Sequence, residues 1–353
     1  MRRICCGFMF SAALLFSAAG AHGFTVTQTG DPGTLVAEIL GPGVTLVGTP
    51  TFIGSALGAG TFTGGAASGI SMAQGIILAS GDVSRAPCSN LGGEAGSDFG
   101  VPGDADLGLF VPGYETLDAS GLEFDFSVAP GPSLDLAFNF VFASDEYHEY
   151  VDSRFNDVFG FFVDGLNIGL VPGTNLPVTV NTLNQQTNAA YYVNNPPGES
   201  APFALEYDGF TKVITAHLKG IAPGTHHMKL VVADTSDSLG DSAVFIQAGS
   251  FSVELWHDAT DLGGGWKWLS WFGYFNDTGT GWIYHNEHTW MLAVGTATSS
   301  IWLWTPDMGW LWSSHTMYPY LYRDSDGAWL WYLLGSSGPR WFNNMKTGAW
   351  ESH

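Results

Sequence analysis

Residues 122–128, LEFDFSV, alternate apolar and polar side chains without interruption. A period of two places the apolar side chains on one face of a β-strand and the polar side chains on the other. The same alternation returns after the turn-forming sequence Pro130-Gly131-Pro132. Its apolar members are Leu134, Leu136, Phe138, Phe140 and Phe142. The two segments predict a β-hairpin with one buried face.

Further strand-like segments follow, separated by Gly, Pro, Asn and Asp. They cover residues 159–163, 178–183, 213–218, 227–233 and 244–255. No stretch shows the apolar periodicity of an amphipathic helix of three turns. Many short strands with turn residues between them predict an all-β fold, a jelly-roll-like β-sandwich whose strand topology stays open.

All 14 tryptophans lie from Trp256 onward. This change in composition predicts a boundary between a sandwich of residues 24–255 and a smaller module of residues 256–353. In that module, four tryptophans recur at spacings of 20, 19 and 21 residues: Trp290, Trp310, Trp329 and Trp350. A period near 20 predicts a chain of aromatic β-hairpins, which must stack on their neighbours because one hairpin cannot bury its own aromatic side chains.

The N-terminus has the three parts of a secretory signal peptide. Met1-Arg2-Arg3 is followed by an apolar stretch over residues 4–19 and by small residues up to Gly23. We therefore expect residues 1–23 to be a signal peptide and the protein to be secreted, extracellular or associated with the cell surface. No later stretch approaches the roughly 18 apolar residues that suggest a transmembrane helix.

The chain is strongly acidic, with 33 acidic against 11 basic residues and a formal net charge of −22 at pH 7. Such a surface repels nucleic acid and anionic lipid, and it attracts divalent cations. Cys5 and Cys6 belong to the expected signal peptide, so Cys88 has no partner for a disulfide within the mature chain. Core packing, helped by metal, must therefore stabilise the fold.

Several sequence phrases over residues 31–253 resemble, in the same order, the choice-of-anchor L domain of secreted and surface proteins from environmental bacteria. They are GIILASG at 75–81, GDADL at 103–107, VFASDEY at 141–147, FNDVFGFF at 155–162 and DSAVF at 241–245. The resemblance implies an extracellular domain joined to one of several C-terminal anchors, with no established catalytic activity. This chain differs from members that end in a sorting tail, because the tryptophan-rich module occupies that place.

The tryptophan-rich module resembles C-terminal regions of secreted proteins from aquatic bacteria and, more distantly, the aromatic hairpin repeats of choline-binding and cell-wall-binding proteins. Exposed aromatic rings stack on sugars or enclose quaternary ammonium groups, although the same rings can instead form the core of a hairpin array. We expect one tryptophan of each close pair to face outward. The ligand-binding candidates are Trp302, Trp304, Trp310, Trp312, Trp329 and Trp331.

Acidic residues at the ends of several predicted strands indicate a calcium site, because Ca²⁺ takes six to eight oxygen ligands from carboxylates and carbonyls. The candidates are Asp145, Glu146, Asp157, Asp234, Asp237 and Asp241. The alternative is that these side chains are solvated or cap turns. Asp104 and Asp106 form a weaker calcium candidate.

Enzyme motifs are weak in this sequence. Paired carboxylates at roughly 5 to 9.5 Å catalyse glycoside hydrolysis, but sequence gives no such distance. The chain has no Gly-x-Ser-x-Gly nucleophile elbow, no His-Glu-x-x-His zinc motif and no phosphate-binding loop. His285 and His288 are expected to diverge at a hairpin tip, and His226 and His227 to alternate across a strand.

These observations predict a non-catalytic adhesion or matrix protein. Its aromatic repeats attach it to envelope or extracellular polysaccharide, or to a surface protein. In one alternative the sandwich binds the glycan or protein, and the repeats are a passive stalk. In the other, the protein is a secreted carbohydrate hydrolase with catalytic acids among Asp145, Glu146 and Asp157.

Overall fold

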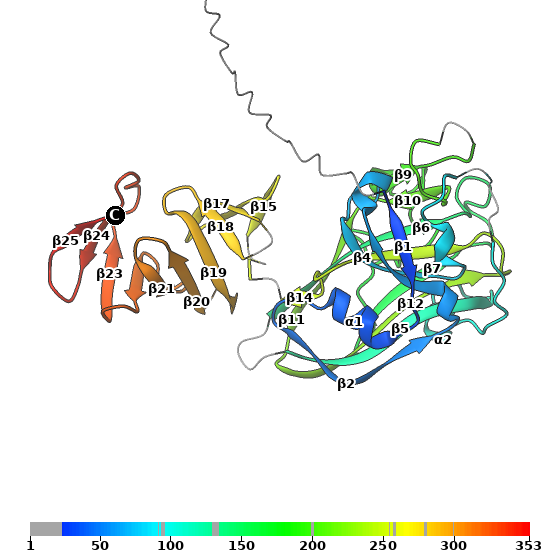
Figure 1. The fold of residues 1–353 in the computed structure, drawn as a ribbon, viewed down its shortest axis with the longest axis horizontal. Helices are drawn as coiled ribbons and strands as arrows, with labels where there is room; N and C mark the ends of the chain where they lie inside the picture. Colours follow the sequence, from blue (N-terminus) through cyan, green and yellow to red (C-terminus); the bar gives the residue numbers. More distant parts are fainter. Residues whose placement is uncertain are drawn as a thin grey trace, which may run out of the picture.

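The computed structural model describes residues 23–90, 92, 96–128, 134–198, 201–253, 255–256, 259–278, 281–298 and 300–353. The expected signal peptide and the predicted turn at 130–132 lie outside the described residues. The described strands form three antiparallel sheets of nine, five and eleven strands (Figure 1). The prediction of an all-β protein is confirmed.

The nine-stranded sheet is built around β6, which pairs with four other strands. Its main path is β1 (Thr25–Gln28), β3 (Ala59–Thr63), β4 (Gln74–Ala79), β13 (Ser242–Gln247), β6 (Leu134–Ser144), β10 (Gly209–Thr211) and β9 (Tyr192–Asn194). β11 (Ile214–Ile221) and β14 (Ser252–Val253) also pair with β6.

The five-stranded sheet packs face to face on the first to make the β-sandwich. Its order is β2 (Val44–Ile53), β5 (Thr116–Val128), β12 (Gly224–Thr235), β7 (Val158–Val163) and β8 (Leu166–Asn167). The ring centroids of Phe138 on β6 and Phe161 on β7 lie 4.4 Å apart, and those of Phe140 and Phe159 lie 5.2 Å apart. Aromatic contacts across the core therefore join the two sheets.

The predicted hairpin between the LEFDFSV segment and the next strand is wrong. β5 pairs with β2 and β12, whereas β6 belongs to the other sheet. The predicted apolar face of β5 is nevertheless buried, and Phe126 of β5 and Phe138 of β6 both contact the ring of Phe251 in the core. A period of two shows which face is buried, but it does not identify the hydrogen-bonded neighbour.

Two other predicted strands also differ from the structure. Residues 178–183 form only an isolated bridge at Thr179, because the Thr179 hydroxyl accepts a hydrogen bond from the backbone N–H of Thr182 and holds a turn. The predicted strand 244–255 is divided into β13 and β14. Most apolar side chains of residues 178–183 and 244–255 are still buried, so hydrophobicity located the core correctly.

Short helices lie in the connections between the strands of the sandwich. Helix α1 (Pro32–Ile39) starts at Asp31, whose side chain accepts a hydrogen bond from the backbone of Thr34, and it buries Leu35, Val36 and Ile39. The other helices are α2 (Ala105–Gly108), η1 (Ala56–Gly58), η2 (Gly65–Ser68), η3 (Val83–Arg85) and η4 (Ala189–Tyr191). In the part of the chain that the structure describes, no helix has the length and apolar character needed to cross a membrane.

The eleven-stranded sheet is a meander in which each strand pairs with the next, drawn in yellow to red in Figure 1. Its strands are β15 (Thr260–Gly263), β16 (Trp266–Leu269), β17 (Gly273–Asp277), β18 (Trp282–His285), β19 (Thr289–Ala297), β20 (Ser300–Thr305), β21 (Gly309–Ser313), β22 (Tyr320–Arg323), β23 (Ala328–Tyr332), β24 (Trp341–Asn344) and β25 (Trp350–Ser352). The period near 20 corresponds to two strands. The predicted hairpins join edge to edge by backbone hydrogen bonds to form this one sheet.

This sheet curls so that strands distant in its order come into contact. The ring centroids of His288, just before β19, and Tyr332, at the end of β23, lie 4.3 Å apart. Strands four positions apart in a flat sheet would be separated by about 19 Å. The Tyr332 hydroxyl also donates a hydrogen bond of 2.8 Å to Glu287. The curl closes the inner face over a core that includes Phe275, Leu303 and Leu330.

Candidate acidic centre and aromatic face

Five of the six acids predicted to bind calcium are buried: Asp145, Glu146, Asp157, Asp234 and Asp241 expose between 0 and 4 % of their surface. Strand pairing brings them together. The pair Ala233↔Val158 sets Asp234 of β12 beside Asp157, just before β7. The pair Ser242↔Ser144 sets Asp241, just before β13, beside Asp145, just after β6. We call these five residues the acidic centre.

Hydrogen bonds hold part of the acidic centre. The Asp157 carboxyl accepts one of 2.9 Å from the backbone of Thr235 and one of 2.7 Å from the Ser242 hydroxyl. Asp241 accepts a hydrogen bond of 3.0 Å from the backbone of Ser97. The sixth predicted acid, Asp237, is only half-buried, and it accepts a hydrogen bond from the backbone of Leu239 in its own loop.

Two members of the acidic centre have buried oxygens without hydrogen-bond partners among the described residues. They are both oxygens of Asp234 and the Oδ2 atom of Asp145. An ionised carboxylate in this state is strongly destabilised unless a proton or a cation neutralises it. The carboxylates of Asp145 and Asp234 therefore require a bound proton or cation for neutralisation.

Burial raises the pKa values of the four aspartates of the acidic centre. The pKa of Asp157 rises to about 8 and that of Asp241 to about 6, in both cases mainly because the side chain is buried. The pKa of Asp234 rises well above its ordinary value through burial and the neighbouring charge of Asp157. The pKa of Asp145 rises in the same direction, through burial and the charge of Asp208. Without a cation, protons occupy part of the acidic centre at neutral pH.

Two glycines let the backbone approach the acidic centre closely. A Cβ atom on Gly81 would lie 1.6 Å from the Oδ2 atom of Asp241. Gly240 has a φ of +72°, and a Cβ atom there would lie 2.6 Å from the Oε1 atom of Glu146. Larger side chains would displace both carboxylates, so these two positions require glycine.

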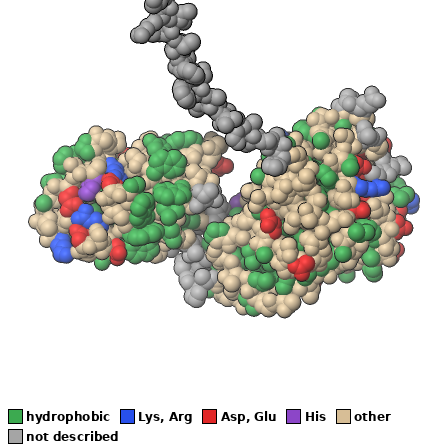
Figure 2. All heavy atoms as spheres, in the orientation of Figure 1, with side chains coloured by type: hydrophobic (Ala, Val, Ile, Leu, Met, Phe, Trp, Pro, Cys, Tyr) green, Lys and Arg blue, Asp and Glu red, His purple; other side chains and the backbone are tan. Residues whose placement is uncertain are grey.

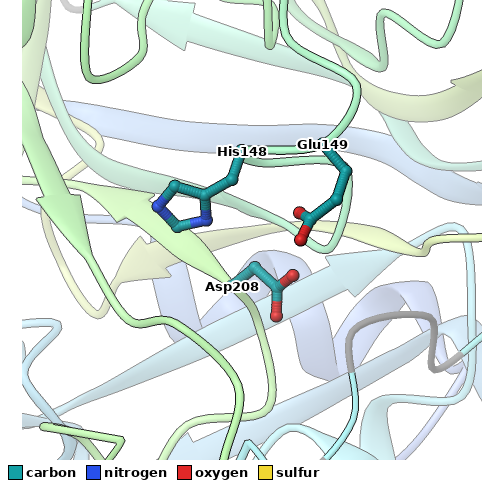
Figure 3. A group of neighbouring side chains, drawn as sticks. All are labelled: His148, Glu149 and Asp208. Atoms are coloured by element: carbon teal, nitrogen blue, oxygen red, sulfur yellow. The ribbon is translucent and has the colours of Figure 1, made fainter.

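His148, Glu149 and Asp208 form a second group beside the acidic centre (Figure 3). Their potential ligand atoms all lie within 4.8 Å of one another. Among the described residues, no other group of three or more His, Cys, Asp or Glu side chains meets this condition, and none of the six predicted calcium ligands belongs to it. The pairing of Gly209 with Ser144 brings Asp208 to this place.

This second group was not among the candidates predicted from the sequence, chiefly because of Asp208. His148 and Glu149 lie two and three residues after Glu146, so the sequence did offer a signal for these two residues. Asp208 precedes β10, a strand of only three residues, and its neighbour across the sheet lies more than sixty residues away in the chain. A strand of this length gives no recognisable alternation.

The weaker calcium candidates have a structural role. The Nζ atom of Lys229 lies 2.6 Å from a carboxylate oxygen of both Asp104 and Asp106. Asp104 also caps α2, because its side chain accepts hydrogen bonds from the backbone of Asp106 and Leu107. Lys229 therefore compensates the negative charges of Asp104 and Asp106.

The histidines of the 285–288 segment do not diverge, and this prediction is wrong. Both are buried, with ring centroids 4.9 Å apart. The Nδ1 atom of His285 accepts hydrogen bonds from the backbone of Glu287 and His288, and its Nε2 atom lies 2.7 Å from the Phe272 carbonyl oxygen. Both ring nitrogens of His285 are therefore used inside the fold, and burial lowers the pKa of His288 well below its usual range.

The eleven-stranded sheet presents aromatic side chains on its outer face. Leu303, Leu311 and Leu330 point into the core, while the tryptophans on either side of each leucine lie on the opposite face. Cross-strand pairs continue this arrangement from β16 to β25. We call this surface the aromatic face; it consists of Trp266, Trp268, Tyr274, Trp282, Tyr284, Trp290, Trp302, Trp304, Trp310, Trp312, Tyr320, Tyr322, Trp329, Trp331, Trp341 and Trp350.

All six predicted tryptophans belong to the aromatic face, but the expectation that one of each pair turns away is wrong. Trp302 and Trp304 are two residues apart in a strand, so they share a face. Trp310 is 37 % exposed, and the other five are half-buried by neighbouring rings. Trp312 and Trp329, for example, meet edge to face with centroids 6.0 Å apart. Figure 2 shows a broad hydrophobic area on this part of the molecule.

A family model for the Choice-of-anchor L domain matches residues 25–252 of the chain. The match covers the two sheets of the sandwich and ends before the eleven-stranded sheet. No curated protein and no solved structure gives a significant match.

Proposed function

The chain belongs to the choice-of-anchor L domain family through residues 25–252, and from this premise we propose that it is a non-catalytic adhesion or matrix protein. Membership of the family indicates a cell-surface-associated or secreted protein. The proposal adds that the aromatic face attaches the protein to a neutral polysaccharide of the envelope or extracellular matrix.

The aromatic face is the observation that carries this proposal. Seven of its tryptophans expose between 36 and 50 % of their surface: Trp266, Trp268, Trp282, Trp290, Trp310, Trp341 and Trp350. So much exposed aromatic surface on one face is typical of a binding site. Each ring offers a flat apolar surface to the C–H groups of a sugar.

The polar groups of the aromatic face favour a neutral ligand. Between the rings lie the amides of Asn276 and Asn343 and the hydroxyls of Tyr274 and Tyr320, which can hydrogen-bond to sugar hydroxyls. The described outward positions of β16 to β24 carry no Asp, Glu, Lys or Arg. Aromatic rings alone also bind quaternary ammonium groups, so the hydrogen-bonding amides and hydroxyls are what favour a sugar.

Burial of the acidic centre supports a non-catalytic role for the sandwich acids. Asp145, Glu146 and Asp157 expose 2, 3 and 1 % of their surface. A glycoside hydrolase must bring its acid and its base or nucleophile into contact with the scissile bond of the polysaccharide. In their present position these three carboxyl groups are out of reach of such a substrate.

We also propose that calcium stabilises the sandwich at the acidic centre. The supporting observation is Asp234, whose two buried oxygens have no hydrogen-bond partner in the described part of the chain. Carboxylate oxygens in a polar, closed site are the ligands that Ca²⁺ prefers. A bound cation would remove the repulsion among Asp145, Asp157 and Asp241.

Removal of residues 256–353 tests the attachment proposal. We expect the full chain to remain with the cell envelope during fractionation and to sediment with insoluble envelope polysaccharide, and the truncated chain to be released. Far-UV circular dichroism must show that the truncated chain keeps its β-structure. Retention of a folded truncated chain on the envelope would show that the sandwich binds and that the repeats are a passive stalk.

A further inference from the structure

We propose that His148, Glu149 and Asp208 bind a first-row transition-metal dication, with Zn²⁺ as the best match to these ligands. This site lies beside the acidic centre but uses none of its residues. It goes beyond the proposed attachment function, since the aromatic face belongs to a different sheet.

Asp208 provides the buried end of the site. Its side chain is fully buried, and its Oδ1 atom accepts a hydrogen bond of 2.7 Å from the amide of Asn90. Its Oδ2 atom is buried and has no hydrogen-bond partner among the described residues. Figure 3 shows the carboxylates of Asp208 and Glu149 close to each other, with the ring of His148 beside them. Asp208 therefore has a buried oxygen without a partner that is available to a metal ion.

The hydrogen bonds of His148 hold its ring in a suitable orientation. Its Nε2 atom is engaged by the side-chain oxygen of Asn194 and lies 3.4 Å from the Tyr192 hydroxyl. A metal-binding histidine characteristically donates its second ring N–H to such an oxygen, which fixes the tautomer and directs the other nitrogen to the metal. Here Asn194 would fix Nε2–H and leave Nδ1 as the ligand atom. The residue has a φ of +73°, a left-handed conformation that is uncommon for histidine.

The distances allow one metal ion with small side-chain adjustments. Two ligands on one tetrahedral zinc ion lie about 3.4 Å apart, given metal–ligand bonds of about 2.0 to 2.2 Å. The three ligand atoms of this group lie within 4.8 Å of one another. Glu149 is exposed, so rotation of its side chain can close the difference without disturbing the core.

The local charge also favours a cation. Asp208 is buried, and the carboxylates of Glu149 and Glu206 lie near enough to act on its charge. Asp145 accepts a hydrogen bond of 3.2 Å from the backbone N–H of Asp208, which adds a further buried acid nearby. A dication would compensate these negative charges.

The ligand types distinguish this site from a calcium site. Calcium takes oxygen ligands, whereas zinc combines imidazole nitrogen with carboxylate oxygen. Three protein ligands leave a fourth coordination position. Since Glu149 is exposed and His148 is half-buried, that position faces solvent and is open to water or to an oxygen atom of a binding partner.

Metal titration of the full-length, untagged, metal-free chain tests the proposal. Isothermal titration calorimetry with Zn²⁺ alone should show one high-affinity site per chain, and Ca²⁺ should not displace the bound Zn²⁺. His148→Gln and Asp208→Asn should each weaken Zn²⁺ binding at least tenfold. With Co²⁺ as the probe, a visible absorption band from a nitrogen- and oxygen-ligated site should appear in the wild type and be lost in His148→Gln.

His227→Gln is the matched control. His227 is exposed, and its Nδ1 atom lies 2.8 Å from a carboxylate oxygen of Asp125. Within the part of the chain that the structure describes, no third ligand joins this histidine–carboxylate pair. This variant should bind Zn²⁺ like the wild type. Glu149→Gln supplies a ligand variant at an exposed position in case Asp208→Asn fails to fold. Unchanged Zn²⁺ affinity in folded His148→Gln and Glu149→Gln would overturn the proposal, as would Ca²⁺ binding that depends on His148.

Discussion

The Ser242 hydroxyl donates a hydrogen bond of 2.7 Å to the carboxyl group of Asp157. Ser242 begins β13 in the nine-stranded sheet, whereas Asp157 precedes β7 in the five-stranded sheet. This contact joins the two sheets at a buried position, where a polar group without a partner is costly. It therefore connects the fold of the sandwich to the chemistry of its acidic centre.

Two replacements of Asp157 measure how much its hydrogen bonds contribute to the free energy of unfolding. Asp157→Ala leaves two buried donors, the Thr235 N–H and the Ser242 hydroxyl, without an acceptor, and should lower the free energy of unfolding by at least about 2 kcal/mol. Asp157→Asn keeps the shape and can still accept from Thr235, so it should cost about 1 kcal/mol or less. Denaturant unfolding checks both values. Equal destabilisation by the two variants would contradict the hydrogen-bonding role.

This unfolding is best followed by far-UV circular dichroism and hydrogen exchange. All tryptophans lie from Trp256 onward, so tryptophan fluorescence reports on the eleven-stranded sheet and not on the sandwich. Exchange of peptides from β6, β7 and β12 gives a direct measure of the sandwich.

Stability of the metal-free sandwich should decrease as pH rises from about 4 to about 8. Folding raises the pKa of Asp157 to about 8 and that of Asp241 to about 6, so the folded state binds more protons than the unfolded state between these values and 3.8. The resulting stabilisation is complete below the unfolded pKa and is lost as pH rises through the folded pKa. Unfolding midpoints at pH 5 and pH 8 in the presence of chelator measure the effect, and a higher midpoint at pH 8 would contradict it. Asp157→Asn should reduce the dependence.

The sequence predicted the buried faces better than it predicted the partners of each strand. Alternation correctly marked Phe124 and Phe138 as core residues, because burial depends on the side-chain period alone. It did not show that β5 and β6 lie in opposite sheets, because strand pairing depends on contacts that are distant in the chain. The same limit hid Asp208 from the candidate site. The tryptophan pairs were misjudged locally, since residues two apart in a strand share a face.

Calcium should raise the unfolding midpoint of the sandwich if it binds the acidic centre. A ligand present at one hundred times its dissociation constant stabilises the folded state by about 2.7 kcal/mol. Asp234→Asn should abolish this gain, because Asp234 contributes two buried oxygens without partners among the described residues. Asp237→Asn is the control, since Asp237 lies half-buried in its own loop. A midpoint that is the same with calcium and with chelator would count against the calcium proposal.

Substitutions at two adjacent residues of β21 should affect different properties of the eleven-stranded sheet. Leu311→Ala should reduce stability, and Trp310→Ala should reduce ligand binding. Leu311 is fully buried, and Leu311→Ala should lower the free energy of unfolding by about 2 to 5 kcal/mol. Trp310 lies on the aromatic face, where its ring meets Trp302 edge to face, so Trp310→Ala should cost only about 1 kcal/mol of stability. Tryptophan fluorescence during denaturant unfolding measures both.

Affinity for a neutral polysaccharide should fall more in Trp310→Ala than in Leu311→Ala, the reverse of the order expected for stability. Loss of a ring contact worth about 1 kcal/mol corresponds to a roughly fivefold weaker affinity for Trp310→Ala, whereas folded Leu311→Ala should bind nearly as well as the wild type. Tyr114→Ala is the control for removal of an exposed aromatic residue from the sandwich. Because a sheet places adjacent residues on opposite faces, only an aromatic face that binds the ligand gives this contrast within one strand. Equal affinity of Trp310→Ala and the wild type would assign binding to another surface.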